Sequence, residues 1–236
     1  REDDLISDKI FINHPYGVCY DYNIIGMWQI ADKQNGLIPD GFEYGTYKVE
    51  DVNNDGKYTA DKDRKIIGYS DPAYRFSIQN SFRYKNWEFK FMINSVQGGK
   101  NYYYGQPGKD LANPDNIYQN NLFNFDYWTP ENPNSDIPAA TNSSSNLVIS
   151  SRVVEDASFL RLKTVTLGYT VPKTFLKKYK IDNARLYVAA QNLWTITGYS
   201  GDDPEVSIRS GGLTPGLDFS SYPRALSVSF GINLGF

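Results

Sequence analysis

The last twelve residues of the chain, 225–236 (ALSVSFGINLGF), alternate large apolar side chains with small or polar ones. Successive side chains of a β-strand point to opposite faces, so this segment predicts a strand with one apolar face and one small, polar face. About 9–11 tilted residues cross a bilayer as a strand, and this segment is long enough to do so. The pattern favours a lipid-facing strand of a transmembrane barrel, and the alternative is an edge strand of a soluble β-sandwich.

A second alternating pattern predicts a β-hairpin. Residues 73–84 place aromatic and aliphatic side chains on one face and Arg, Ser and Gln on the other, and 87–94 repeat this after a two-residue turn at 85–86. Charges facing the interior of a sandwich would be costly to bury unpaired, whereas the lumen of a large barrel is polar. Tyr84 and Trp87 beside the turn suit the aromatic girdle of a membrane interface.

Further strands are predicted at 158–171 and 184–196. In the first of them the apolar phase shifts between Leu162 and Val165, which predicts a β-bulge. The aromatic and β-branched run 16–30 predicts one or two more strands. A short strand is expected at 44–49 and a turn-rich connection at 32–41.

The connections between the predicted strands alternate in length along the chain. Outer-membrane barrels sort their loops in this way, with short periplasmic turns and long extracellular loops. Counting back from the end of the chain, the connections are 197–224 (long), 172–183 (short), 98–157 (long), 85–86 (short) and 31–72 (long).

The number of strands limits what this chain can form alone. It supplies five or six strands of membrane length, and a single-chain barrel needs about eight to close. An open sheet in lipid would leave the hydrogen-bonding groups of its edges unsatisfied. We therefore expect the chain to be a portion of a larger barrel or to assemble with other chains.

The composition agrees with an exported β-protein. The mean hydropathy is −0.52 and no run of eighteen apolar residues exists, so no transmembrane helix is predicted. Tyrosine occurs 19 times, which suits interfacial aromatic side chains. The net charge of −3 and the absence of a basic block argue against nucleic acid as a partner. Cys19 is the only cysteine, so no internal disulfide is expected.

Residues 51–64 (DVNNDGKYTADKDR) are similar to a calcium-binding loop of the EF-hand type. Oxygen-bearing side chains at positions 1, 3 and 5, followed by a glycine, would bring hard oxygens together around the ion. Position 12 is Lys62, so the end of the loop is one residue out of register, and a solvated Asx-rich turn is the alternative. The candidate Ca2+ ligands are Asp51, Asn53, Asp55, Asp61 and Asp63.

The long connection 98–156 is rich in Asn, Gly, Pro and Tyr. Connections of this length are usually functional or disordered, and the many aromatic residues argue against disorder. Aromatic rings can stack on sugar faces or pack against a partner protein. The candidate contacts to a substrate or to a lid protein are the loop 200–221 and Tyr102, Tyr103, Tyr104 and Trp128.

Several short motifs follow one another along the chain. They are an aromatic strand at 17–29, an acidic loop at 51–56 followed by DRKIIG at 63–68, WTPENP at 128–133, EDASFLRLK at 155–163 with TLGYT at 166–170, QNL at 191–193, DPE at 203–205 and YPR at 222–224. In this order and spacing they resemble the C-terminal part of SusC/RagA-family TonB-dependent transporters of Bacteroidetes outer membranes. The resemblance covers essentially the whole chain.

This resemblance implies that residues 1–236 are the C-terminal part of an outer-membrane barrel of about 22 strands, whose plug domain and N-terminal strands lie outside this chain. It implies an importer of oligosaccharides or peptides that is not an enzyme. A SusD-like lipoprotein would act as its lid, and TonB with ExbB and ExbD would supply energy through the missing N-terminal part. The resemblance also implies that the last strand carries the signal read by the barrel-assembly machinery, at Phe230, Ile232, Leu234 and Phe236.

Two other functions fit parts of the sequence. One is a soluble β-sandwich that binds glycans and carries the calcium-type loop. The other is a glycoside hydrolase, which needs two carboxylates about 5–10 Å apart. Its nearest acidic cluster, Asp202, Asp203 and Glu205, lies in a loop without the apolar pattern that would raise a carboxyl pKa.

Overall fold

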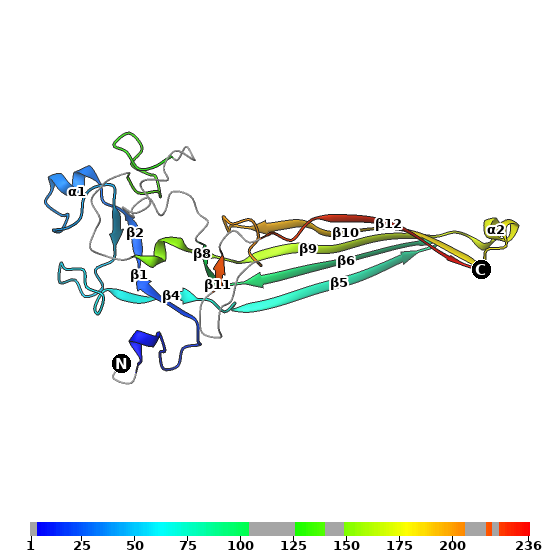
Figure 1. Ribbon diagram of the computed structural model, residues 1–236, viewed down its shortest axis with the longest axis horizontal. Helices are drawn as coiled ribbons and strands as arrows, with labels where there is room; N and C mark the ends of the chain where they lie inside the picture. The colour runs from blue at the N-terminus through cyan, green and yellow to red at the C-terminus, as the bar shows by residue number, and fades with distance from the viewer. Residues whose placement is uncertain (1–3, 104–125, 140–148, 206–215, 219–221) are drawn as a thin grey trace. The chain divides into compact units, whose positions relative to one another are not determined.

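The computed structural model describes residues 4–103, 126–139, 149–205, 216–218 and 222–236. The chain divides into two compact units (Figure 1). Unit 1 comprises 1–71, 100–155 and 207–220, and unit 2 comprises 72–99, 156–206 and 221–236. None of the helices in the described ranges combines the length and the hydropathy needed to cross a membrane.

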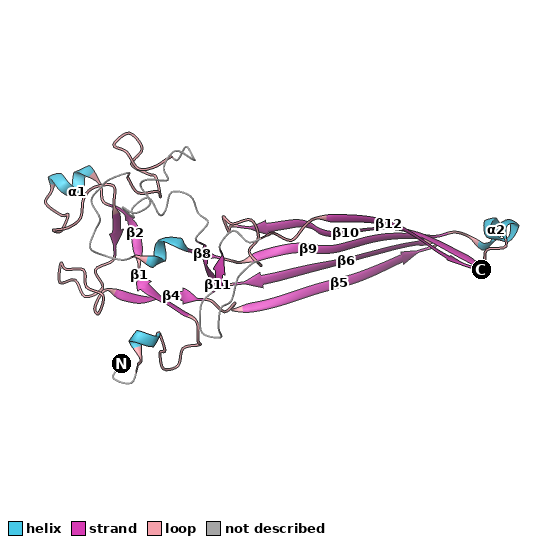
Figure 2. Cartoon of the chain, in the orientation of Figure 1, coloured by secondary structure: helices cyan, strands magenta, loops and turns pink. Residues whose placement is uncertain are grey.

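Unit 2 is built on one five-stranded antiparallel sheet in the order β12-β10-β9-β6-β5 (Figure 2). Its strands are β5 (Tyr74–Tyr84), β6 (Trp87–Gln97), β9 (Phe159–Thr170), β10 (Asn183–Thr197) and β12 (Ser227–Gly235). The predicted hairpin is confirmed as the β5–β6 pair, and the last strand pairs with β10 as its predicted neighbour. The predicted all-β class is therefore confirmed for this unit.

The connections of the sheet sort by length as the sequence predicts. One end carries the short ones: residues 85–86, and a segment that contains α2 (Lys173–Leu176) and the 3-10 helix η4 (Lys177–Tyr179). Lys85 in the tight turn adopts a left-handed φ of 53°. At the opposite end the register places Gln97, Phe159 and Thr197, from which the long connections leave.

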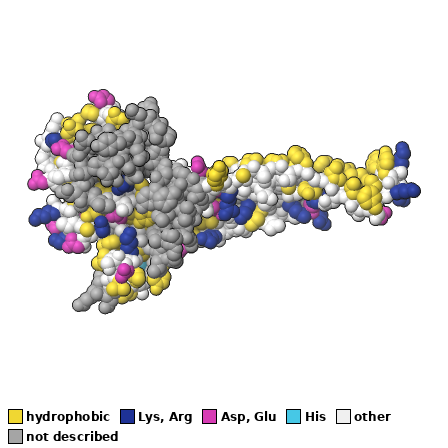
Figure 3. Space-filling view, in the orientation of Figure 1, with side chains coloured by type: hydrophobic (Ala, Val, Ile, Leu, Met, Phe, Trp, Pro, Cys, Tyr) yellow, Lys and Arg dark blue, Asp and Glu magenta, His cyan; other side chains and the backbone are white. Residues whose placement is uncertain are grey.

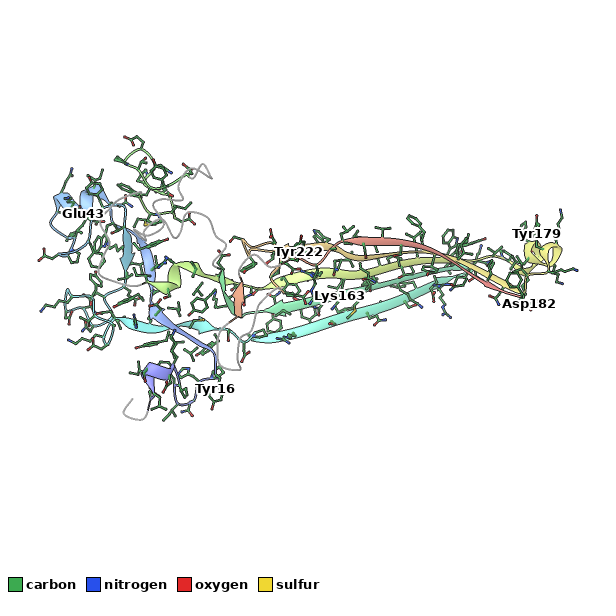
Figure 4. The ribbon with its side chains drawn as sticks, viewed as in Figure 1. Tyr16, Glu43, Lys163, Tyr179, Asp182 and Tyr222 are labelled. Carbon is green, nitrogen blue, oxygen red and sulfur yellow. The ribbon has the colours of Figure 1, made fainter. Side chains whose placement is uncertain are left out.

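The predicted β-bulge is confirmed in β9. Met92 of β6 pairs with Thr164 and Ile93 pairs with Leu162, so Lys163 is the extra residue (Figure 4). β10 shifts at the same level, between Gln191 and Trp194. These irregularities let the apolar residues on both sides of the shift stay on one face.

Unit 1 consists of short elements. β1 (Val18–Tyr22) pairs with β4 (Arg64–Tyr69), and β2 (Ile24–Met27) with β3 (Tyr47–Val49), both antiparallel. β7 (Lys100–Tyr103) pairs in parallel with β11 (Gly216–Asp218), and β8 (Val154–Asp156) completes this three-stranded sheet. The helices are η1 (Ile6–Asp8), α1 (Ile30–Gln34) and η3 (Ser150–Val153).

The core of unit 1 is aromatic and lies between these short strands. Its main cluster consists of Tyr22, Met27, Tyr47, Val49, Trp128 and Ile149. A smaller cluster consists of Cys19, Tyr102 and Val153. The long connections of the sequence thus contain a folded core of their own.

Unit 1 differs from the sequence predictions in two respects. The run 16–30 forms two strands, but they belong to separate two-stranded sheets and neither joins the five-stranded sheet, so five strands have membrane length. The predicted turn at 32–41 begins inside α1. The backbone N–H of Gln29 donates to the carboxylate of Asp32 at 2.9 Å, and this capping box starts a helix that the turn composition concealed.

Candidate functional site

One face of the five-stranded sheet is polar. Paired residues of neighbouring strands share a face, so the register gathers these side chains from all the strands. They are Arg75, Ser77, Gln79, Ser81 and Arg83 of β5; Glu88, Lys90 and Asn94 of β6; Arg161, Thr164 and Thr166 of β9; Arg185, Tyr187 and Gln191 of β10; and Ser227, Ser229 and Asn233 of β12. Such a face can hydrogen-bond water or a polar ligand.

Glu88 organises the charges of the polar face near the short turns. One carboxylate oxygen accepts from Arg83 at 2.9 Å and from Lys90 at 3.0 Å, and the other accepts from Arg185 at 2.7 Å. Three cations therefore surround a single carboxylate, which leaves a local charge of +2.

Arg161 organises the opposite end of the polar face. Its guanidinium forms ion pairs with Asp203 at 2.6 Å and with Glu205 at 2.9 Å. The side chains of Arg161 and Asp203 are each 3% exposed. Burial alone would raise the pKa of the Asp203 carboxyl, but hydrogen bonds from Arg161 and from the backbone N–H groups of Arg224 and Glu205 hold that pKa below its ordinary value.

The other face of the sheet is apolar and exposed. The register continues from strand to strand, as in the row Tyr84, Trp87, Tyr169, Leu186 and Ile232. Many of these side chains are about half exposed, and Figure 3 shows hydrophobic side chains along the sheet. An apolar surface that spans five strands is larger than a soluble monomer normally leaves in contact with water.

The candidate assembly-signal residues lie on this apolar face or at its end. Phe230 is 79% exposed, Ile232 is 64% exposed, Leu234 is 51% exposed and Phe236 is 84% exposed. Their large exposure fits recognition by another protein or by lipid. Their role as an assembly signal stays a prediction.

Unit 1 contains a cleft of about 400 Å³ that Gln29 helps to line. The Gln29 amide donates to the carbonyl oxygens of Met27 and Pro133, each at 3.2 Å, and its oxygen accepts from the Trp128 indole at 3.3 Å. The cleft is lined by Ile24, Gly26, Met27, Gln29, Tyr47 and residues 133–136. Pro133, the last residue of WTPENP, and the three residues after it thus form one wall of a cleft against β2.

The candidate aromatic contacts differ in their settings. Trp128 is 2% exposed and belongs to the main core of unit 1. Tyr102 is 5% exposed and packs with Cys19 in the second cluster. Tyr103 lies in β7, and Tyr104 lies outside the described residues. The side chains of Trp128 and Tyr102 are thus packed inside unit 1. The substrate or lid contacts of all four aromatic residues stay predictions.

In the acidic loop the carboxylates accept backbone hydrogen bonds. Asp51 accepts from the N–H of Gly56 at 2.8 Å, and Asp55 accepts from the N–H of Lys57 at 2.9 Å. Asp63 is fully buried and accepts from the N–H groups of Val52 at 3.1 Å and Thr59 at 2.7 Å. These bonds are those of an Asx-rich turn.

The described residues contain no group of three or more His, Cys, Asp or Glu side chains placed to hold a metal ion. Asn53 donates to the Asp55 carboxylate at 2.8 Å, and Asp61 is exposed. Calcium binding by this loop stays a prediction.

The acidic cluster proposed for hydrolysis is arranged as an ion-pair network. Arg161 contacts the carboxylates of both Asp203 and Glu205. A glycosidase needs one carboxyl that keeps its proton, and the pKa of Asp203 is lowered instead. The geometry gives this cluster a structural role at the start of the loop.

Sequence reasoning missed two of these features. The pairing of Arg161 with Asp203 joins residues 42 positions apart, and the Gln29–Trp128 contact joins residues 99 positions apart. For the Arg161–Asp203 pair, the sequence offered one signal, which is a charged Arg inside an otherwise apolar strand segment. Nothing in the local pattern around Gln29 indicates the second.

No family model matches the chain. Among the similar curated proteins, TonB-dependent receptor P3 of Formosa agariphila is 32% identical over 229 residues, which cover 93% of this chain and 22% of the receptor. TonB-dependent receptor SusC of Bacteroides thetaiotaomicron is 30% identical over 188 residues, which cover 78% of this chain and 17% of SusC. The chain thus spans about a fifth of the length of these relatives.

The chain is also similar in fold to solved structures. A structure of the RagAB peptide transporter matches with a TM-score of 0.66 and 21% identity, over 93% of this chain and 22% of the matched chain. The RagAB peptide importer in its open-open state matches with a TM-score of 0.62 and 23% identity, over 92% of this chain and 22% of the matched chain.

Proposed function

Because the chain belongs to the SusC/RagA family of TonB-dependent receptors, we propose that its five-stranded sheet is a section of the barrel wall of an outer-membrane nutrient importer. The observation that carries this proposal is the two-faced sheet. Lipid would cover the exposed apolar face, and the polar face would line the lumen. Both edges of the sheet, β5 and β12, would pair with strands outside this chain, as closure in lipid demands.

We place residues 1–236 at the C-terminal end of that barrel, with the plug domain and the remaining strands elsewhere in the protein. The tight-turn end of the sheet then faces the periplasm, and the long connections that form unit 1 face the outside of the cell. A SusD-like lipoprotein would cap the outer side, and TonB would act from the periplasm. The folded core of unit 1 supports this role, because a lid needs a shaped surface to close against.

The cargo we propose is an oligosaccharide or a peptide. The cleft around Gln29 and the polar face of the sheet offer amide, hydroxyl and charged groups, which suit either class. Among the similar structures, RagAB is a peptide transporter, which supports the peptide class. Growth of a deletion strain on glycans and on peptides as separate nutrient sources would identify the class.

The soluble β-sandwich is the less favoured function. A sandwich buries the apolar face of each sheet under a second sheet. In the described residues Phe230 and Ile232 are instead mostly exposed. The lipid-facing proposal accounts for this exposure without further assumptions.

A cysteine scan of β12 tests the placement of the two faces. Single cysteines at Ser227, Val228, Ser229 and Phe230 are introduced, and the protein is treated in membranes with a water-soluble maleimide. Ser227 and Ser229 are expected to react, and Val228 and Phe230 to be protected by lipid. Cys19 gives little background because it is fully buried and burial raises the pKa of its thiol. Equal reactivity at all four positions would contradict the proposal.

A further inference from the structure

The short-turn end of the five-stranded sheet is basic. The segment 171–183 contains Lys173, Lys177, Lys178 and Lys180, all exposed, and Asp182 is its only acidic residue. Lys85 adds a fifth exposed cation from the neighbouring turn. Figure 3 shows Lys or Arg side chains at this end, and Figure 4 places Tyr179 and Asp182 there.

These lysines differ from the cations of the polar face. Arg83, Lys90 and Arg185 share the carboxylate of Glu88. In the part of the chain that the structure describes, no carboxylate forms an ion pair with Lys173, Lys177 or Lys178. Their charge is therefore available to a partner outside the unit.

The same turn exposes two aromatic rings. Phe175 in α2 is 69% exposed, and Tyr179 at the end of η4 is 67% exposed. Leu176 between them is only 7% exposed and anchors the segment. A short segment with an anchored apolar residue, exposed aromatic rings and several lysines suits the boundary between lipid and water.

This segment follows the end of β9, where the apolar face of the sheet carries aromatic side chains. Near this end the apolar face carries three neighbouring aromatic residues: the ring centroids of Trp87 and Tyr169 are 4.7 Å apart, and Tyr84 is 70% exposed. Lys85, Trp87 and Lys173 also line one cleft of about 480 Å³ at this end of the sheet, together with Arg83 and Glu88 of the polar face. Aromatic side chains of this kind mark the headgroup level of a bilayer, so in a lipid-facing sheet the lysines that follow would lie at the depth of lipid phosphates.

We propose that Lys85, Lys173, Lys177, Lys178 and Lys180 bind the headgroups of anionic phospholipids at the membrane surface next to the short turns. The proposal rests on the proposed function, because the apolar face must contact lipid for this end to meet headgroups. The lysines would anchor the edge of the barrel wall at a fixed depth and select anionic lipids around it.

Quenching by brominated lipids tests the proposal, because Trp87 lies next to the lysines on the lipid-facing side. The protein that carries this chain is reconstituted with brominated phosphatidylcholine or brominated phosphatidylglycerol. The fluorescence of the Trp87→Phe variant is subtracted from that of the wild type. The difference is the emission of Trp87 alone, so its quenching is separated from that of the other tryptophans. Stronger quenching by phosphatidylglycerol is expected. Each lysine near a charged lipid surface contributes about a fivefold factor in affinity, so Lys177→Gln with Lys178→Gln should reduce the preference severalfold.

Two controls make the outcomes distinct. Trp194 is 53% exposed in the same sheet but pairs with Leu162, far along β9 from Tyr169, and should show little preference for either lipid. Lys57→Gln with Lys62→Gln removes the same charge from unit 1 and should leave the preference unchanged. Equal quenching of Trp87 by the two lipids, or an unchanged preference in the Lys177/Lys178 variant, overturns the lipid selection alone. Absence of quenching by both lipids overturns the proposed function as well.

Discussion

Arg161 of β9 and Asp203 of the loop after β10 form an ion pair of 2.6 Å in which each side chain is only 3% exposed. Glu205 forms an ion pair with the same guanidinium at 2.9 Å, and the backbone N–H of Arg224 donates to Asp203 at 3.0 Å. The network therefore ties the two ends of the long 198–226 connection to the polar face of the sheet. It determines where this loop starts and where it returns to β12.

Replacement of Arg161 by Ala is expected to destabilise unit 2 by about 3–5 kcal/mol, because it leaves a buried carboxylate without its cation. The double substitution Arg161→Met with Asp203→Leu should cost clearly less, since it removes the buried Asp203 carboxylate together with its cation, and Arg224 still pairs with Glu205 at 3.4 Å. Urea unfolding followed by gel mobility measures both. If Arg161→Ala matched the wild type, the buried pair would not stabilise the fold.

Asp203 should also make the stability of unit 2 depend on pH. The folded-state pKa of its carboxyl is lowered, so the unfolded chain binds a proton more readily than the folded one. The stabilisation is fully present above the unfolded pKa of about 4 and is lost as the pH falls through the lower folded pKa. The free energies of unfolding of the wild type and of Asp203→Asn should therefore be similar at low pH, and the wild type should be the more stable near neutral pH. A constant difference across this range would contradict the assignment.

A charge on the lipid-facing side of β12 should prevent stable insertion. Phe230→Arg is expected to cost about 2–4 kcal/mol if the position lies near the bilayer midplane. Ser229→Arg is the matched control, because its side chain belongs to the polar face and opposes Ala189 of β10. The amount of heat-modifiable protein in outer-membrane fractions reports insertion. Equal loss for both variants would argue against a lipid-facing row.

The predictable part of this fold is the part with a simple periodicity. Alternation in 73–84 and 87–94 specified the β5–β6 hairpin, and the phase shift after Leu162 located the bulge, because a strand repeats every two residues. Unit 1 lacks such a signal. Its strands have at most six residues, and its core depends on contacts such as that between Gln29 and Trp128, which local patterns do not encode.

The same limit applies to the candidate sites. Aromatic residues in a long loop suggested exposed contacts, yet Trp128 and Tyr102 are buried, since aromatic side chains also supply the largest apolar area for a small core. The acidic loop had the right residue types for calcium, but the positions of Asp51 and Asp63 are determined by which backbone N–H groups face them. The residue types predicted that the loop would offer carboxylate oxygens as acceptors. Only the fold shows that backbone N–H groups donate to them.

Trp128 offers a test that separates packing from ligand contact. Trp128→Ala should destabilise unit 1 by about 3–5 kcal/mol, as expected for a buried aromatic side chain. Gly45→Ala should act in the same direction, because its Cβ would lie 2.6 Å from the Trp128 ring and Gly45 has a φ of +77°. Limited proteolysis of unit 1 measures the loss. Unchanged protease resistance in Trp128→Ala, with weaker substrate binding, would instead favour a direct contact.

Asn192 sits at the irregularity of β10 with a left-handed φ of 51°, and its amide donates to the carbonyl oxygen of Ala225 at 3.0 Å. Asn192→Gly keeps the backbone conformation accessible and loses only the hydrogen bond, at a cost of about 1 kcal/mol. Asn192→Val loses the bond and also forces a β-branched residue into the left-handed region, which adds about 1–2 kcal/mol. The urea concentration at the unfolding midpoint should therefore be highest for the wild type, lower for Asn192→Gly and lowest for Asn192→Val. If Val were as stable as Gly, the backbone at this position would not be left-handed, and the register of β10 with β9 beyond Gln191 would need revision.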